Sequence, residues 1–118
     1  GARSVEIEEL RSEDGRFRFV MQPDRTLVLY MEEDAVWAIY LASRSDPYET
    51  DTPLQLVLRT DGNLVAVDSS SSALVWESHT SNVAPGPYTL KMHNDGNCVL
   101  YGGGGVVTLW ATRTQGWG

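Results

Sequence analysis

A chain of 118 residues, of which 42% are hydrophobic and 21% charged, has the size and composition of one globular domain rather than of a disordered segment. Sixteen acidic against nine basic side chains leave a formal net charge of −7, which disfavours nucleic acid and anionic lipid surfaces as partners. No stretch approaches the roughly 20 apolar residues of a membrane-spanning helix, so membrane insertion is not expected. The acidic Glu6, Glu8 and Glu9 are the reverse of the basic start of a signal peptide.

Three copies of one pattern follow each other along the chain and set the order of the expected elements. Each copy has an alternating apolar stretch, a central aspartate and a closing tryptophan. The copies span about residues 17–42, 54–80 and 88–114, and their aspartate and tryptophan pairs are Asp24 and Trp37, Asp61 and Trp76, and Asp95 and Trp110. We therefore expect a single domain, residues 1–118, built from one repeated unit.

The first repeat begins with residues 17–21, whose period-two alternation of apolar side chains predicts a half-buried strand. A turn at Asp24 leads into a second strand that ends at Tyr30. The acidic residues 32–34 predict a solvent-exposed connection to a short strand that contains Trp37.

The second repeat has the same alternation in residues 54–58, followed by the pair Asp61-Gly62. Asp-Gly is a strong hairpin signal because glycine accepts a positive φ without a steric cost. The polar residues 68–72 then connect the second strand to the strand with Trp76.

The third repeat begins with alternating residues 88–92 and turns at Asp95-Gly96. The glycine run 102–105 connects its second strand to the closing strand with Trp110. Joins at residues 43–52 and 80–87, both with prolines, separate the repeats. No segment has the pattern of a helix of ordinary length, so the chain is predicted to be all-β.

One repeat cannot bury its apolar face alone, so we expect three sheets to pack their inner faces together as a three-sided prism. Trp37, Trp76 and Trp110 are predicted to form the shared centre rather than platforms for a ligand. Cys98 is expected to be a small buried hydrophobe rather than a nucleophile. Trp117 is expected either to pack at a dimer contact or to belong to a frayed end.

Each repeat resembles the Gln-x-Asp-x-Asn-x-Val-x-Tyr motif of the bulb-type, or monocot mannose-binding, lectins. Residues 76–80 and 110–114 are also similar to the Trp-x-Ser/Thr-x-Thr closings of that family. The resemblance implies a β-prism II of three four-stranded antiparallel sheets with pseudo-threefold symmetry and up to one mannose pocket per repeat. It further implies a non-catalytic, carbohydrate-binding protein for mannose or mannose-rich glycans, without a cofactor, and frequently a homodimer that exchanges C-terminal strands.

The motif suits a sugar because a mannose hydroxyl both donates and accepts hydrogen bonds, which a carboxylate next to an amide can match. In an extended strand its first and last positions would lie about 26 Å apart, so the turn at the aspartate must bring them together. In the family, as the resemblance implies, Gln, Asp, Asn and Tyr hold ring hydroxyls, and Val contacts ring carbons.

The three repeats match this motif unequally. The third repeat is the best candidate, with His93 in place of Gln, followed by Asp95, Asn97, Val99 and Tyr101. The first is predicted to be weakened, with Thr26 in place of Asn among Gln22, Asp24, Val28 and Tyr30. The second is predicted to be inactive for neutral mannose or altered in specificity, because it keeps Asp61, Asn63 and Val65 but has Arg59 for Gln and Val67 for Tyr.

Other interpretations of these residues stay open. The aspartates and asparagines also suit turns in which their side chains bond to nearby backbone groups. Gln22, Tyr30 and Tyr101 have no role in a turn and favour binding, whereas His93 alone is also typical of an ordinary surface residue. The departures from the motif leave a second hypothesis, a prism that has lost sugar binding and acts as a protein-interaction or structural module.

An enzyme is not predicted. His79, His93 and Cys98 lack the close spacing of a zinc site, and no nucleophile elbow, phosphate loop or dinucleotide fingerprint is present. The acidic clusters at residues 6–9 and 32–34 belong to the N-terminal segment and to a turn. Glycoside hydrolysis would need two carboxylates that face each other across a cleft.

Overall fold

The computed structural model describes residues 4–41 and 53–116, and within these ranges every regular element is a β-strand. The strands are β1 (Val5–Ile7), β2 (Glu9–Arg11), β3 (Phe17–Met21), β4 (Thr26–Met31), β5 (Asp34–Tyr40), β6 (Leu54–Leu58), β7 (Leu64–Asp68), β8 (Leu74–Glu77), β9 (Thr89–Met92), β10 (Cys98–Gly102) and β11 (Val107–Ala111). Nothing in the described part of the chain is a helix able to cross a bilayer. The join at residues 43–52 and Trp117 lie outside the described residues.

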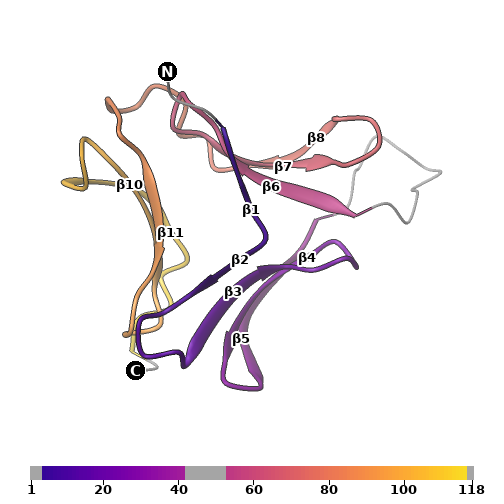
Figure 1. Ribbon diagram of the computed structural model, residues 1–118, viewed down its shortest axis with the longest axis vertical. Helices are drawn as coiled ribbons and strands as arrows, with labels where there is room; N and C mark the ends of the chain where they lie inside the picture. Colours follow the sequence, from indigo (N-terminus) through magenta and orange to yellow (C-terminus); the bar gives the residue numbers. More distant parts are fainter. Residues whose placement is uncertain (1–3, 42–52, 117–118) are drawn as a thin grey trace.

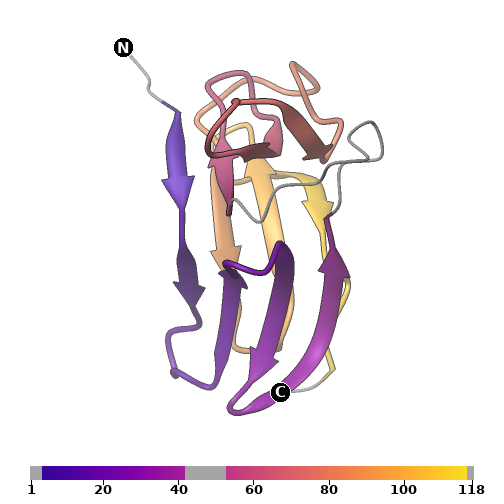
Figure 2. The same cartoon turned by 90° about the vertical axis from the view of Figure 1, so that its right-hand side faces the viewer.

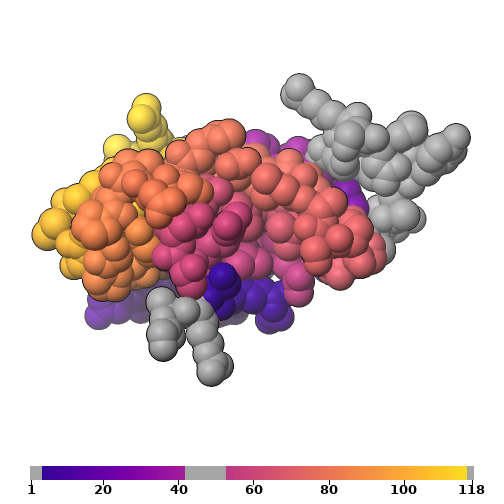
Figure 3. Space-filling model, turned by 90° about the horizontal axis from the view of Figure 1, so that it is seen from above, coloured from indigo at the N-terminus to yellow at the C-terminus, as the bar shows by residue number. Residues whose placement is uncertain are grey.

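The strands form three antiparallel sheets, one for each repeat, with the orders β2-β3-β4-β5, β1-β6-β7-β8 and β11-β10-β9. Viewed down the shortest axis, the sheets are the three sides of a prism (Figure 1). From above, the second and third repeats lie side by side (Figure 3). The predicted all-β prism of three antiparallel sheets is confirmed.

The number of strands in a sheet depends on the N-terminal segment. This segment bends at Glu8, so that β1 pairs with β6 while β2 pairs with β3. Figure 2 shows β1 and β2 in line along one side of the molecule. One extended segment thus supplies the fourth strand to two sheets. The expected four strands are present in these two, whereas the sheet of the third repeat has three strands within the described residues.

A β-bulge recurs at the same place in each repeat. The pairing of the second and third strands skips the residue just before the tryptophan, which is Val36, Val75 or Leu109. Regular alternation would turn two consecutive side chains to opposite faces, and a bulge removes this restriction. As a result, each of these residues and the tryptophan after it pack against the core.

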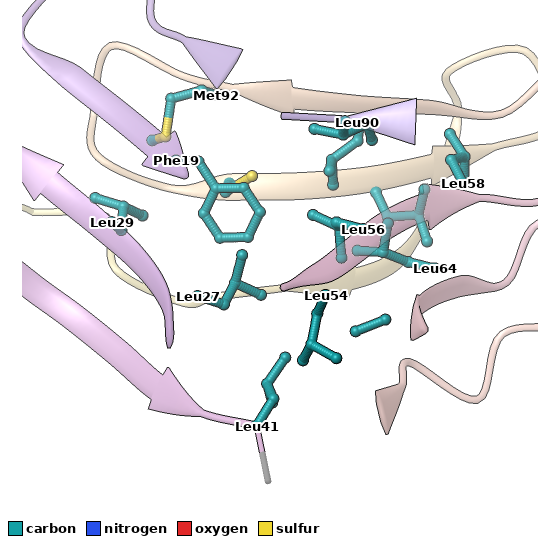
Figure 4. Packing of buried hydrophobic residues seen from close by; sticks show 14 of the residues in the cluster. Phe19, Leu27, Leu29, Leu41, Leu54, Leu56, Leu58, Leu64, Leu90 and Met92 are labelled. Atoms are coloured by element: carbon teal, nitrogen blue, oxygen red, sulfur yellow. The ribbon is translucent and has the colours of Figure 1, made fainter. Parts of the chain in front are cut away.

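The core lies where the inner faces of the three sheets meet (Figure 4). Its largest fully buried side chains come from all three repeats, namely Phe17, Phe19, Leu27, Leu29, Leu56, Leu64, Leu100 and Cys98. The ring of Trp110 lies 6.4 Å from that of Trp37 and 5.6 Å from that of Trp76, between ring centroids. The tryptophans pack against this core as expected, but they are only partly buried, and the fully buried centre consists of phenylalanine, leucine and cysteine side chains. The predicted burial of Cys98 is confirmed.

The turn of the first repeat differs from the other two. Gly62 and Gly96 have φ values of 90° and 92°, as their Asp-Gly pairs predict, but Arg25 stands at this place in the first repeat with a φ of 69°. The Arg25 side chain is buried, and its Nη2 lies 2.6 Å from Oδ2 of Asp68 at the end of β7. This buried ion pair fastens the first turn to the second sheet.

Candidate functional site

The central aspartate of each motif forms a turn. One carboxylate oxygen accepts the backbone N–H of the residue two positions later, at 3.0 Å from Thr26 N, 2.9 Å from Asn63 N and 2.9 Å from Asn97 N. The turn-forming interpretation of the aspartates is therefore confirmed. In each case the other carboxylate oxygen takes no part in this turn.

In the third repeat, the first and last motif positions meet as the hairpin was expected to bring them together. His93 follows β9 and Tyr101 lies on β10, and the His93 Nε2 is 2.7 Å from the Tyr101 hydroxyl. The two rings stand edge to face, with centroids 5.8 Å apart. Cys98 and Leu100 of β10 point into the core, so the alternating Asn97, Val99 and Tyr101 lie on the outer face.

Asn97 is held in one orientation by the closing segment of its repeat. Its Oδ1 accepts hydrogen bonds from the backbone N–H of Arg113 at 2.9 Å and of Thr114 at 3.4 Å, and from the Thr112 hydroxyl at 3.3 Å. Because backbone N–H groups only donate, the oxygen of the amide must face them and the NH₂ group must face away. Within the described residues, this NH₂ group donates to no protein atom, and no buried side-chain nitrogen lacks a partner. The Asn97 amide thus presents a donor to solvent.

Asp95 has a similar division of roles. Its Oδ1 is used in the turn, while Oδ2 makes no hydrogen bond or ion pair to the part of the chain that the structure describes. The third repeat therefore offers an open acceptor on Asp95, an open donor on Asn97 and the linked ring groups of His93 and Tyr101. A ligand with neighbouring hydroxyl groups can both accept from and donate to such an arrangement.

The second repeat has the same turn but satisfies its polar groups internally. Asn63 Oδ1 accepts from the Ser78 hydroxyl at 3.1 Å and from the Thr80 N–H at 3.2 Å, as in the third repeat. Its NH₂ group, however, donates to Glu77 Oε1 at 3.1 Å. Val67, at the place of the motif tyrosine, offers no hydroxyl.

Both oxygens of Asp61 are in use. Oδ1 accepts the Asn63 N–H, and Oδ2 accepts the Ser81 hydroxyl at 3.1 Å and lies 3.4 Å from Nη2 of Arg59. The pKa of Asp61 is below its ordinary value, chiefly because its carboxylate accepts the Asn63 backbone hydrogen bond. Partial burial raises this pKa, but the hydrogen bond from Ser81 and the charge of Arg59 lower it further. Both carboxylate oxygens of Asp61 are therefore engaged by other groups of the protein.

The first repeat keeps one half of the arrangement. The Gln22 amide donates to the Tyr30 hydroxyl, so the first and last motif positions meet here as well. The guanidinium of Arg18 lies 4.8 Å from the centroid of the Tyr30 ring, a contact that the motif does not contain. Thr26 has no amide, and the closing segment has apolar Ile39 and the buried Leu41 where the other repeats have hydroxyl side chains.

The motif valines contribute little surface. Val28, Val65 and Val99 expose 3%, 3% and 5% of their area. They support the strands from which the polar residues extend, and they can offer a ligand only a narrow apolar contact.

Several residues near the motifs have a role in the site that was not predicted from the sequence. Thr112 and Thr114, like Ser78 and Thr80, position the asparagines, and the Trp-x-Ser/Thr-x-Thr closing was the signal that could have assigned this role. Glu77 had no such signal. Across residues 4–41 and 53–116, no group of three or more His, Cys, Asp or Glu side chains is placed to hold a metal ion.

Comparison with known proteins places this arrangement in a family. The chain is 35% identical over 100 residues to a mannose-specific lectin of Aloe arborescens, covering 85% of this chain and 82% of that protein. A monocot mannose-binding lectin from Gastrodia elata, solved as a monomer, superposes with a TM-score of 0.69 at 29% identity, over 99% of this chain and 100% of that one.

A second solved structure is the mannose-specific agglutinin of snowdrop (Galanthus nivalis) bulbs, complexed with methyl-α-D-mannoside. It matches with a TM-score of 0.62 at 30% identity, over 97% of this chain and 98% of that chain. No family model matches the chain. The sequence relationship to the Aloe protein and the shared fold show that this chain belongs to the bulb-type, or monocot mannose-binding, lectin family.

Proposed function

We propose that residues 1–118 act as one lectin domain that binds mannose or mannose-rich glycans without changing them chemically, and that the third repeat carries the principal site. The observation that carries this proposal is the open donor of Asn97 beside the open acceptor of Asp95. Family membership supports it, since the relative from Aloe is mannose-specific and the snowdrop protein was solved with a mannoside.

Each residue has a separate task in this site. Asp95 Oδ2 accepts and the Asn97 NH₂ group donates, so the two hold one sugar hydroxyl or two adjacent ones. His93 and Tyr101, the first and last motif positions, have side chains linked at 2.7 Å and hold another hydroxyl of the sugar. Val99 contacts the ring carbons over its small exposed area. Because the protein groups are fixed by their own hydrogen bonds before the sugar arrives, little ordering is required on binding.

The other two repeats contribute less. The first has a weakened site, because Gln22, Asp24, Val28 and Tyr30 keep their places but Thr26 has no amide donor. The second is inactive for neutral mannose, because Asp61, Asn63 and their neighbours hydrogen-bond to one another. A monosaccharide held by a few polar contacts at one shallow site is expected to bind near the millimolar level, about −4 kcal/mol.

Useful affinity for a cell-surface glycan therefore requires several sites acting together. A homodimer formed through the C-terminal strands would double the number of third-repeat sites. Sedimentation equilibrium would show a dimer mass if this holds and a monomer mass if it does not.

The function is tested by a glycan array followed by calorimetric titration with methyl-α-mannoside, with methyl-α-galactoside as the control. We expect mannose-terminated glycans to be bound on the array and a millimolar Kd for the mannoside only. A silent array together with a flat titration would contradict the proposal. It would favour the prism as a protein-interaction or structural module. Release of free sugar from the array glycans would contradict the non-catalytic part.

A further inference from the structure

One of the positions at which the second and third repeats differ lies beside the recognised motif but outside it. On β8, Glu77 pairs with Val65, and on β11, Ala111 pairs with Val99. The equivalent position of the first repeat, opposite Val28, is Ala38. A carboxylate therefore lies beside the motif in the second repeat and a methyl group in the others.

The carboxylate at this position reaches the group that would face a sugar. The Oε1 of Glu77 lies 3.1 Å from Nδ2 of Asn63, diagonally across the strand pair, where side chains on the same face are in reach of each other. The ring of His79 lies 3.5 Å from the same oxygen. In the third repeat the shorter Ala111 cannot reach Asn97, whose NH₂ group stays open.

We infer that Glu77 is a built-in plug of the second site, and that the residue at this position decides whether a repeat can take a neutral sugar. The inference rests on the proposed function of the third repeat. A charge-assisted hydrogen bond from the amide to a carboxylate is stronger than one to a neutral hydroxyl, so a sugar cannot displace Glu77 at an affinity in the millimolar range. Arg59 occupies the neighbouring acceptor in a similar way, because its Nη2 lies 3.4 Å from Oδ2 of Asp61.

The first test transfers the plug to the third repeat. In the variant Ala111→Glu, the new side chain is expected to engage Asn97, and Arg113 stands where His79 stands in the second repeat to hold it. We expect the affinity for methyl-α-mannoside to fall at least tenfold. Ala111→Met, with a side chain of similar length and no acceptor for the amide, is the matched control and should retain binding within about threefold.

Two results of this first test would overturn the inference. One is unchanged binding by Ala111→Glu, with a native-like circular dichroism spectrum. The other is an equal loss in Ala111→Met, because bulk rather than the hydrogen bond would then explain the effect.

The second test removes the plug. In a background with Ser81→Ala, which removes the hydroxyl that donates to Oδ2 of Asp61, the double substitution Arg59→His and Val67→Tyr gives the second repeat the motif side chains of the third. Adding Glu77→Ala to this double variant removes the carboxylate as well. Titration with methyl-α-mannoside, followed by NMR, should shift the Asn63 side-chain amide only in the triple variant. The Asn97 amide serves as an internal standard in the same sample.

The outcomes separate the plug from the underlying function. Shifts at Asn97 without any at Asn63 in the triple variant would refute the plug, as would equal shifts at Asn63 in the double variant. No shift at either amide would instead refute the proposed mannose binding, and with it the inference that rests on it.

Discussion

Replacing Asn97 separates its structural role from its binding role. Asn97→Ala removes the acceptor for the N–H groups of Arg113 and Thr114, while the Thr112 hydroxyl keeps its contacts with Cys98 N at 3.1 Å and with Thr114. Two hydrogen bonds from backbone N–H groups to the Asn97 side chain are then lost, each with a net contribution to stability of about 0.5–1.5 kcal/mol. The free energy of unfolding should fall by about 1–3 kcal/mol. Asn97→Asp keeps an oxygen facing both N–H groups, so its stability should stay within about 1 kcal/mol of the parent.

Urea denaturation followed by tryptophan fluorescence measures both changes, provided that the slope of unfolding free energy against urea is the same in all three proteins. The aspartate variant should remain folded yet lose mannoside binding, since it replaces the outward donor with an acceptor. Equal stability of the alanine variant and the parent would refute the role of the oxygen. Undiminished sugar binding by the aspartate variant would refute the role of the NH₂ group.

Three further predictions concern the scaffold. Asp68→Ala leaves the buried Arg25 guanidinium without this carboxylate and should lower the free energy of unfolding by about 3–5 kcal/mol in urea; a loss below about 1 kcal/mol would show that the pair contributes little. The pKa of Asp61 in the folded protein is depressed, mainly by the Asn63 N–H. The ionised Asp61 therefore stabilises the fold at a pH above the ordinary aspartate pKa of about 3.9. This stabilisation is lost as the pH falls through the pKa that Asp61 has in the folded protein. Asp61→Asn should accordingly show a smaller drop in urea midpoint between pH 5 and pH 2 than the parent, and an equal drop would argue against this linkage. Burial raises the pKa of the Cys98 thiol, so a disulfide reagent should label it only in denaturant, and rapid labelling of the native protein would contradict the packing.

The fold could be predicted from the sequence because its determinants are local and repeated. In the first strand of each repeat, apolar side chains such as Phe17 and Phe19 alternate with other residues, and this alternation gives the strand one buried face. The Asp-Gly pairs demand a turn with positive φ, which Gly62 and Gly96 have. Neither feature depends on contacts between distant parts of the chain.

The buried ion pair of the first turn could not be predicted in this way. Arg25 occupies a glycine-like conformation, and its charge is matched by Asp68, which is 43 positions away in the sequence. Only the packing of the first sheet against the second brings them together. That the third sheet has only three strands within residues 4–41 and 53–116 could not be predicted for a related reason, since short N-terminal strands give no clear sign of which sheet they will join.

The candidate site was predictable as a list of residues but not as a set of open and closed hydrogen-bonding groups. The motif identifies Asn63 and Asn97 as equivalents, and both are held alike by the closing segments. Their difference arises from Glu77 and Ala111, which lie on a neighbouring strand and outside the motif. Which side chain reaches an amide is a property of three-dimensional geometry that the pattern does not contain.

The most direct test of the central claim is an NMR titration of the ¹⁵N-labelled protein with methyl-α-mannoside, observed at the side-chain amides of Asn63 and Asn97. We expect saturable shifts of the Asn97 NH₂ signals and of the signals around His93 and Tyr101 at millimolar sugar, with the Asn63 signals unmoved. Signals of Asn97 that stay constant up to high sugar concentration would contradict the claim that the third repeat is the sugar site.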